Sequence, residues 1–314
     1  MRLGFGLLAI VCGVLLAQPA QIEPRRRTPA PARDEGRDAP NLRIDTTLVL
    51  VPVTVSDPLN RPVVGLEKEN FRLFEDRVER QILNFSMEDE PTAVGLIFDT
   101  SGSMGEKLKR SRLAAVEFFK TANPEDEFFL VEFDSRPRLV VPLTHDTTKI
   151  ESELLFSRSK GSTALMDAIY LGLHEMRKSR KSKKALLVIS DGGDNSSRYT
   201  VSELNHLVRE SDVLIYGIGL FGGAGTPEEQ SGPWLLNRIA EETGGRLFIA
   251  NAGELPDIAK KIGIDLRNRY VLGYTPTGVE RDGKYHHIRV QVIAPRGMPK
   301  LTAHWRTGYY APLR

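Results

Sequence analysis

Apolar runs alternate with amphipathic stretches between residues 91 and 268. Short apolar runs bounded by polar turn residues predict strands at Val94–Asp99, Phe128–Phe133, Ala185–Ser190, Val213–Gly219 and Arg246–Ile249. Stretches with apolar residues at helical spacing predict helices at Lys107–Thr121, Thr163–Lys178, Val201–Glu210, Pro233–Thr243 and Leu255–Asn268. This alternation is typical of a doubly wound, mostly parallel, Rossmann-like α/β sheet, to which Arg138–Pro142 can add an antiparallel edge strand.

The two flanks of this α/β region have the pattern of β-strands instead. Residues 41–90 contain β-branched or alternating runs at Asp45–Val55, Phe71–Phe74 and Gln81–Phe85, and the polar Glu75–Arg77 segment predicts a turn between the last two. Residues 269–314 contain strand candidates at Arg269–Tyr274, His286–Ile293 and Leu301–Trp305. Neither flank is long enough to bury a core alone. We therefore predict that the two flanks pair into one small β-rich accessory domain.

Residues 1–20 have the pattern of a secretory signal peptide. Met1-Arg2 supplies a basic start, Leu3–Leu16 is a continuous apolar core, and small residues follow at Ala17–Ala20. The apolar core is shorter than the roughly 18 residues that span a bilayer. We therefore expect cleavage, a secreted, periplasmic or cell-surface location, and no stable membrane span afterwards. Residues 21–40, rich in Pro, Ala and Arg, predict a disordered linker.

Oxygen-bearing side chains gather at one predicted edge of the sheet. Asp99 ends the first strand, and the hydroxyls of Ser101 and Ser103 follow it. Thr163 opens a predicted helix, and Asp191 follows another predicted strand. Ligand sites of open α/β sheets lie at the carboxyl ends of the strands. Carboxylates together with neutral oxygens suit Mg²⁺ or Mn²⁺ and suit zinc poorly. A simpler alternative is that Asp99 caps the following helix and the serines face solvent.

This order of residues resembles the von Willebrand factor type A domain with its metal-ion-dependent adhesion site. The family pattern is Asp-x-Ser-x-Ser, then a Thr, then an Asp after a later strand, and it is filled here by Asp99, Ser101, Ser103, Thr163 and Asp191. The resemblance implies that the two serines and the threonine contact the metal and that the two acids act through water or as outer ligands. It also implies one open coordination position that a partner's carboxylate can fill.

The flanks add a resemblance to a bacterial secreted subgroup of the same superfamily. A Val-Thr-Val-x-Asp and Phe-x-Leu-Phe-Glu-Asp prelude matches Val53–Asp57 and Phe71–Asp76. A Tyr-Val-Leu-Gly-Tyr and Gly-Tyr-Tyr ending matches Tyr270–Tyr274 and Gly308–Tyr310. The resemblance covers nearly the whole mature chain, and it implies little about function.

Other chemistries fit the sequence less well. The Asp99 segment looks superficially like an aspartic-protease loop, but those proteases are all-β and use a matched carboxylate dyad. The sequence has no Walker loop and no His-Glu-x-x-His motif, and its formal net charge of +2 does not indicate nucleic acid binding. A metal-assisted hydrolase would need a general base, for which Glu106 and Asp194 are the nearest candidates in sequence. Cys12, the single cysteine, lies in the signal segment, so no disulfide is expected in the mature chain.

We therefore predict a secreted, non-enzymatic module whose binding depends on Mg²⁺ or Mn²⁺. The metal site would lie in the α/β domain predicted at residues 91–268. The expected partner is a protein that presents an Asp or Glu. One alternative is a structural scaffold in which the metal only braces the loops. A metal-assisted hydrolase is a further alternative.

Overall fold

The computed structural model describes residues 48–88, 90–221, 227–250, 253–276 and 283–311. These residues all belong to one unit of the chain, residues 46–314. The predicted signal peptide at 1–20 and linker at 21–40 lie outside the described residues. Within the described ranges, no helix is both apolar enough and long enough to cross a bilayer.

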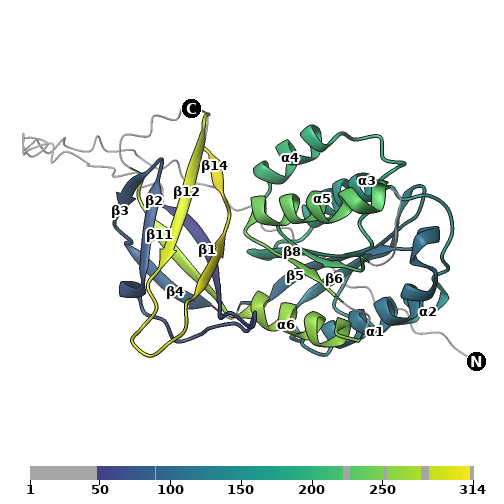
Figure 1. The fold of residues 1–314 in the computed structure, drawn as a ribbon, viewed down its shortest axis with the longest axis horizontal. Coiled ribbons are helices and arrows are strands. Elements are labelled where there is room, and N and C mark those ends of the chain that lie inside the picture. Colours follow the sequence, from purple (N-terminus) through teal and green to yellow (C-terminus); the bar gives the residue numbers. More distant parts are fainter. Residues whose placement is uncertain (1–47, 89, 222–226, 251–252, 277–282, 312–314) are drawn as a thin grey trace, which may run out of the picture. The chain divides into compact units, whose positions relative to one another are not determined.

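A six-stranded sheet forms the centre of the α/β part, in the order β10-β9-β8-β5-β6-β7 (Figure 1). Its strands are β5 (Thr92–Asp99), β6 (Glu127–Phe133), β7 (Pro137–Thr144), β8 (Lys183–Ser190), β9 (Leu214–Gly219) and β10 (Leu247–Ile249). Neighbouring strands run parallel, except that β7 is antiparallel to β6. The predicted fold class, mixed α/β with a mostly parallel central sheet and extra antiparallel strands, is confirmed.

Helices cover both faces of this sheet. They are α1 (Leu108–Phe119), α2 (Thr147–Phe156), α3 (Leu165–Met176), α4 (Val201–Glu210), α5 (Pro227–Thr243) and α6 (Leu255–Arg267). Figure 1 shows α3, α4 and α5 on one face and α1 and α6 on the other. Each face of the sheet has its own hydrophobic core. Side chains alternate along a strand, so successive β5 residues contribute to the two cores in turn. Leu96 and Phe98 pack in the core that contains α1 and α6, and Ile97 packs in the core that contains α3.

Two of these helices differ from the prediction. Helix α2 was not predicted, although Asp146 caps it by accepting a hydrogen bond from the Thr148 N–H at 3.1 Å. Its apolar pattern is obscured because Leu155 and Phe156 are exposed beside the buried Ile150 and Leu154. Helix α5 begins at Pro227, so Pro233, which was predicted to start it, lies inside the helix.

Two four-stranded antiparallel sheets are built from both flanks of the chain. Their orders are β13-β1-β11-β4 and β14-β12-β2-β3. The strands are β1 (Val49–Ser56), β2 (Phe71–Glu75), β3 (Val78–Arg80), β4 (Asn84–Glu88), β11 (Arg269–Tyr274), β12 (Tyr285–Val292), β13 (Thr302–Trp305) and β14 (Gly308–Tyr310). One buried apolar cluster contains residues of both flanks, among them Val51, Leu73 and Leu272. Strands from the two flanks thus share one core.

The turn after β2 leads to a different strand from the one predicted. Asp76 and Arg77 adopt positive φ angles of 47° and 73°, and β3 then returns along β2 with Leu73 opposite Arg80. The following β4 pairs with β11 in the other sheet instead of continuing the hairpin. The strand β3 has only an exposed Val78 between charged residues, so its sequence did not predict a strand. Ile82 is buried and resembles a strand residue, but it lies outside the assigned strands.

A buried carboxylate joins these two sheets. Glu75 is fully buried, and it accepts hydrogen bonds from the Tyr274 hydroxyl at 2.7 Å and the Tyr309 hydroxyl at 2.8 Å. Its other oxygen pairs with the Arg80 guanidinium at 2.9 Å. The charge is therefore compensated inside the core.

We expect Glu75→Ala to lower the free energy of unfolding by about 3 kcal/mol, because it leaves a guanidinium and two hydroxyls without their buried partner. Urea denaturation measures the change. The matched control is Glu79→Ala, since Glu79 lies 3.8 Å from Arg72 and both side chains are exposed. Equal destabilisation by the two variants would contradict a structural role of the Glu75 network.

Candidate functional site

The residues predicted to form the site lie at the carboxyl edge of the central sheet. Asp99 is the last residue of β5, and Asp191 directly follows the last residue of β8, the strand paired with β5. Ser101 and Ser103 lie at the start of η2, a short 3-10 segment (Gly102–Lys107). Thr163 comes just before α3.

Hydrogen bonds to backbone carbonyls hold the loops of this edge together. The Gly102 N–H donates to the Gly161 carbonyl at 2.9 Å, and the Ser159 hydroxyl donates to the Ser101 carbonyl at 2.6 Å. A side chain at Gly102 would come within 3.2 Å of the Gly161 oxygen, so this close approach favours glycine. The loop that carries Thr163 is thereby fixed against the loop that carries the two serines.

Asp99 is buried and hydrogen-bonded at both oxygens. It accepts a hydrogen bond from the Ser101 N–H at 2.8 Å and one from the Ser190 hydroxyl at 2.5 Å. Burial is the main cause that raises the pKa of Asp99 to about 6, and the nearby charge of Asp191 acts in the same direction. A cation bound beside Asp99 would offset both effects and favour its ionised form.

Asp191 has one paired and one unpaired oxygen. The Lys107 ammonium lies 2.9 Å from its Oδ2 atom. Its Oδ1 atom is buried and has no hydrogen-bond partner among the described residues. Leaving such an atom unpaired costs about 1–3 kcal/mol or more. This oxygen of Asp191 is therefore available to a cation or to a further hydrogen-bond donor.

The hydroxyl groups of the site supply neutral oxygens. The Ser101 and Ser103 hydroxyls lie 3.1 Å apart, with Ser101 buried and Ser103 exposed. The Thr163 N–H donates to the Asn195 side chain at 2.9 Å, which fixes the backbone of Thr163. Within the part of the chain that the structure describes, the Thr163 hydroxyl makes no hydrogen bond. These three hydroxyls and the two acids are the oxygen-bearing side chains that the sequence predicted for the site.

Lys107 was not among the predicted site residues. The predicted residues were oxygen ligands only, whereas Lys107 brings a positive charge into the site from the end of η2. The signal was a lysine four residues after Ser103.

The suggested general bases do not fit a hydrolytic role. Asp194 accepts hydrogen bonds from the Met166 N–H at 2.8 Å and the Ser197 hydroxyl at 2.6 Å, so its carboxylate braces the loop. Glu106 is exposed on η2, and within the described ranges it forms no hydrogen bond or ion pair with the other site residues. In the described residues, no three His, Cys, Asp or Glu side chains form a metal-binding group. A purely oxygen site of hydroxyls with two acids remains the candidate.

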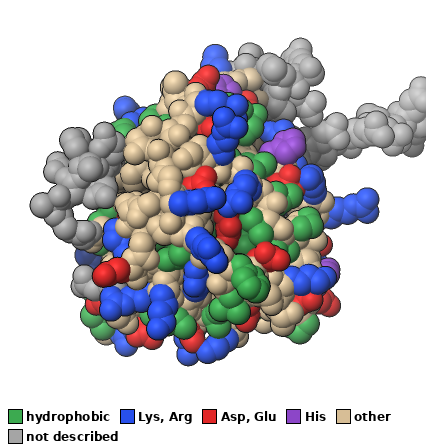
Figure 2. Space-filling model, turned by 90° about the vertical axis from the view of Figure 1, so that its right-hand side faces the viewer, with side chains coloured by type: hydrophobic (Ala, Val, Ile, Leu, Met, Phe, Trp, Pro, Cys, Tyr) green, Lys and Arg blue, Asp and Glu red, His purple; other side chains and the backbone are tan. Residues whose placement is uncertain are grey.

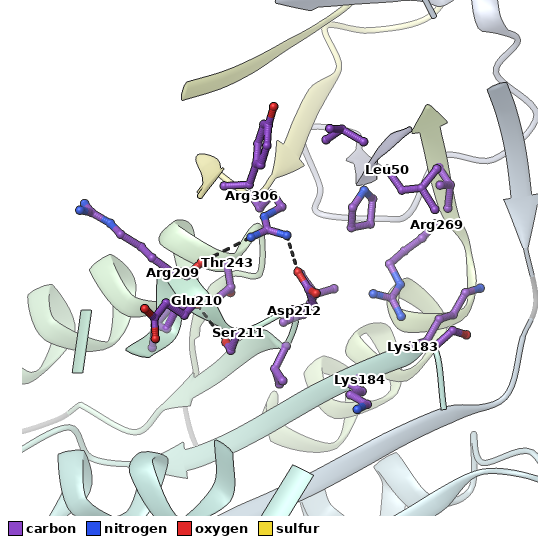
Figure 3. A pocket seen from close by; sticks show the side chains of 18 of the residues that line it. Leu50, Lys183, Lys184, Arg209, Glu210, Ser211, Asp212, Thr243, Arg269 and Arg306 are labelled. Carbon is purple, nitrogen blue, oxygen red and sulfur yellow. Dashed lines mark hydrogen bonds and ion pairs between the residues drawn. The ribbon is translucent and has the colours of Figure 1, made fainter. Parts of the chain in front are cut away.

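A cavity of about 620 Å³ lies at the other end of β8 (Figure 3). Lys183 and Lys184 begin this strand, whereas Asp191 follows its far end. Two ion pairs lie in the wall of the cavity: Arg306 with Asp212 at 2.5 Å, and Arg209 with Glu242 at 2.8 Å. Its lining comes from segments near residues 48–52, 182–184, 208–214, 269–271 and 306–310. The sequence did not predict it, because these segments meet only in the fold.

Comparisons with known proteins agree with the fold of the α/β part. Residues 94–193, which include every predicted metal ligand, match the family model of the von Willebrand factor type A domain. The structure resembles that of a von Willebrand factor type A protein from Catenulispora acidiphila with a TM-score of 0.50 and 12% sequence identity, covering 77% of this chain and 75% of that one. At this identity the likeness shows the fold alone.

Curated relatives match at lower coverage. The chain is 26% identical over 181 residues to an uncharacterized protein of Borreliella burgdorferi, covering 50% of this chain and 53% of that protein. It is 25% identical over 233 residues to inter alpha-trypsin inhibitor heavy chain 4 of Mus musculus, covering 66% of this chain and 24% of that protein. The chain thus spans about half of the first relative and about a quarter of the second.

Because of the Lys107–Asp191 contact, replacing Lys107 should lower the stability of the protein but raise its affinity for Mg²⁺. Without divalent cation, Lys107→Met should lower the thermal midpoint, because it removes the partner of a buried carboxylate. With Mg²⁺, the same change should tighten cation binding about ten-fold, because it removes a positive charge next to the site. Thermal midpoints across a Mg²⁺ titration measure both effects.

Lys109→Met is the matched control, since Lys109 is exposed on α1 and forms no ion pair among the described residues. Identical Mg²⁺ dissociation constants for Lys107→Met and the unmodified protein would show that Lys107 does not influence the site.

Proposed function

We propose, on the premise that the α/β part of this chain is a von Willebrand factor type A domain, that it is a protein-binding module that depends on a divalent cation. In this proposal the module is not an enzyme. It acts outside the cytoplasm after removal of the predicted signal peptide at residues 1–20.

The proposed cation is Mg²⁺ or Mn²⁺. The hydroxyls of Ser101, Ser103 and Thr163 would hold it directly, and Asp99 and Asp191 would hold it through water. Three neutral ligands leave most of the charge of the ion uncompensated, so a carboxylate is the favoured further ligand. The cation would supply a Lewis-acidic position for an Asp or Glu of the partner, and the chain's own residues orient that position.

One observation supports this proposal more than any other. The Oδ1 atom of Asp191 is buried without a hydrogen-bond partner in the described ranges, at the edge where the three hydroxyls lie. Neutral donors or water could pair with it, but Asp99 adds a second buried carboxylate at the end of the adjacent strand. Two buried acids close together favour a nearby positive charge, and Lys107 pairs with only one oxygen of one acid.

The structural alternative receives less support. In that alternative a metal braces the loops and the partner binds elsewhere. The loops are already joined without a cation by the Gly102–Gly161 and Ser159–Ser101 hydrogen bonds. The bonds from Asp194 to the Met166 and Ser197 donors brace the neighbouring loop in the same way. These loops therefore have bracing contacts within the chain itself.

We expect Mg²⁺ to raise the thermal midpoint of the chain without its signal peptide, and Ser101→Ala to remove that rise. Binding to the folded state alone stabilises it by about 1.4 kcal/mol when the cation is at ten times its dissociation constant. Differential scanning fluorimetry with Mg²⁺, Mn²⁺ and a chelator measures the effect.

Ser152→Ala is the control, because Ser152 is an exposed α2 residue whose hydroxyl donates only to the Thr148 carbonyl at 2.7 Å. It should keep the full Mg²⁺ response. A midpoint that does not respond to either cation at high concentration would refute the metal site. An equal response in Ser101→Ala would place the bound cation elsewhere.

A further inference from the structure

Two basic side chains flank a residue that is hydrogen-bonded to the candidate metal site. Arg158 and Lys160 stand on either side of Ser159, whose hydroxyl donates to the Ser101 carbonyl at 2.6 Å. The Lys160 N–H donates to the Thr100 carbonyl at 2.8 Å. Both side chains are exposed. The backbone that carries them is therefore held directly against the loop that carries the serines.

A third basic side chain lies on the next loop. The Ser162 N–H donates to the Ser135 hydroxyl at 3.0 Å, and the Ala164 N–H donates to the Asp134 carbonyl at 2.9 Å. Arg136 directly follows Ser135 and is exposed. We call Arg136, Arg158 and Lys160 the basic rim, since all three lie on loops bonded to the segment around Thr163.

The three cations of the basic rim differ from neighbouring cations in their pairing. None of its three side chains forms an ion pair within the described part of the chain. Other cations of this region are paired: Arg138 with Glu132 at 3.6 Å and Arg198 with Asp167 at 3.3 Å. Unpaired positive charges thus remain beside the site, although the formal net charge of the chain is only +2.

Figure 2 shows the side of the molecule that lies to the right in Figure 1, where α2 is drawn. Lys and Arg side chains are numerous there, interspersed with acidic and hydrophobic side chains, beside a surface of backbone and uncharged polar or glycine residues. Neighbouring like charges repel one another, and this repulsion is relieved when an oppositely charged partner binds. Such a surface also increases the association rate of an acidic partner.

In the proposed function, one Asp or Glu of a partner segment coordinates the metal. We propose that the basic rim binds further carboxylates of that same segment. The partner is then an acidic protein segment with several Asp or Glu residues close together, and a segment with a single acid binds more weakly. This inference rests on the proposed function for its first contact. The rim contact itself needs only the three cations and no metal.

The test compares two fluorescein-labelled peptides of equal length by fluorescence anisotropy at saturating Mg²⁺. One peptide carries a single Asp among neutral residues, and the other carries the same Asp between several Glu residues. We expect the acidic peptide to bind about ten-fold more tightly to the unmodified protein. Arg158→Glu combined with Lys160→Glu should abolish that preference and leave the affinity for the single-Asp peptide nearly unchanged.

The matched control is Arg177→Glu combined with Arg180→Glu, which makes the same change in net charge. Both residues are exposed, without an ion pair among the described residues, and they follow the C-terminal end of α3. Because α3 has 12 residues and begins beside Thr163, this end lies about 18 Å from the site. The control should keep the preference for the acidic peptide.

The outcomes separate the two proposals. Equal affinities of the unmodified protein for both peptides, or equal losses in the rim and control variants, would overturn the basic rim while leaving the metal site intact. If a chelator leaves acidic-peptide binding unchanged and the rim variant abolishes it, the rim is supported and the metal-dependent part of the proposed function fails. A Mg²⁺-induced rise of the thermal midpoint in the rim variant shows that the variant is folded and its metal site is present.

Discussion

The arrangement of the site depends on two buried carboxylates at the ends of adjacent parallel strands. Asp99 and Asp191 are 0% and 2% exposed, and β5 and β8 pair in parallel up to Phe98 opposite Ile189, next to the two acids. Parallel pairing in a sheet buried on both faces fixes the two acids at one edge. Their charges are poorly solvated there, so they require positive charge or hydrogen-bond donors nearby. Lys107, Ser190 and the Ser101 N–H meet part of this need.

The flanking sheets are joined to the α/β part by a second buried polar group. The Arg246 guanidinium lies 3.1 Å from the Ser56 hydroxyl on β1 and 2.9 Å from Asp265 on α6. The Tyr216 hydroxyl on β9 also donates to Asp265 at 3.0 Å. Burial raises the pKa of Asp265, and the Arg246 charge opposes that shift.

Much of the fold could be predicted because local signals and tertiary packing agree. Helix α4 begins and ends as predicted, since Thr200 and Glu203 form a capping box at its start. The order of strands and helices predicted the mostly parallel sheet, and the Asp-x-Ser-x-Ser segment predicted which edge carries the oxygens. Errors arose where tertiary packing decided the outcome, as in the hairpin of β2 with β3 and in α5 around Pro233.

Pairing of charges could not be predicted from the sequence. Whether a lysine is paired depends on residues far along the chain: Lys107 contacts Asp191, whereas Lys160 has no acidic partner in the described ranges. For this reason the sequence predicted the oxygen-bearing residues of the candidate site but neither the Lys107 charge beside them nor the basic rim.

The most direct measurement is a titration of the purified chain with Mn²⁺, in which electron paramagnetic resonance counts the ions bound. The account predicts one bound Mn²⁺ per chain that Mg²⁺ displaces, and loss of that ion in Asp191→Asn. Absence of a bound ion, or equal binding by the variant, would contradict a cation site at the ends of β5 and β8.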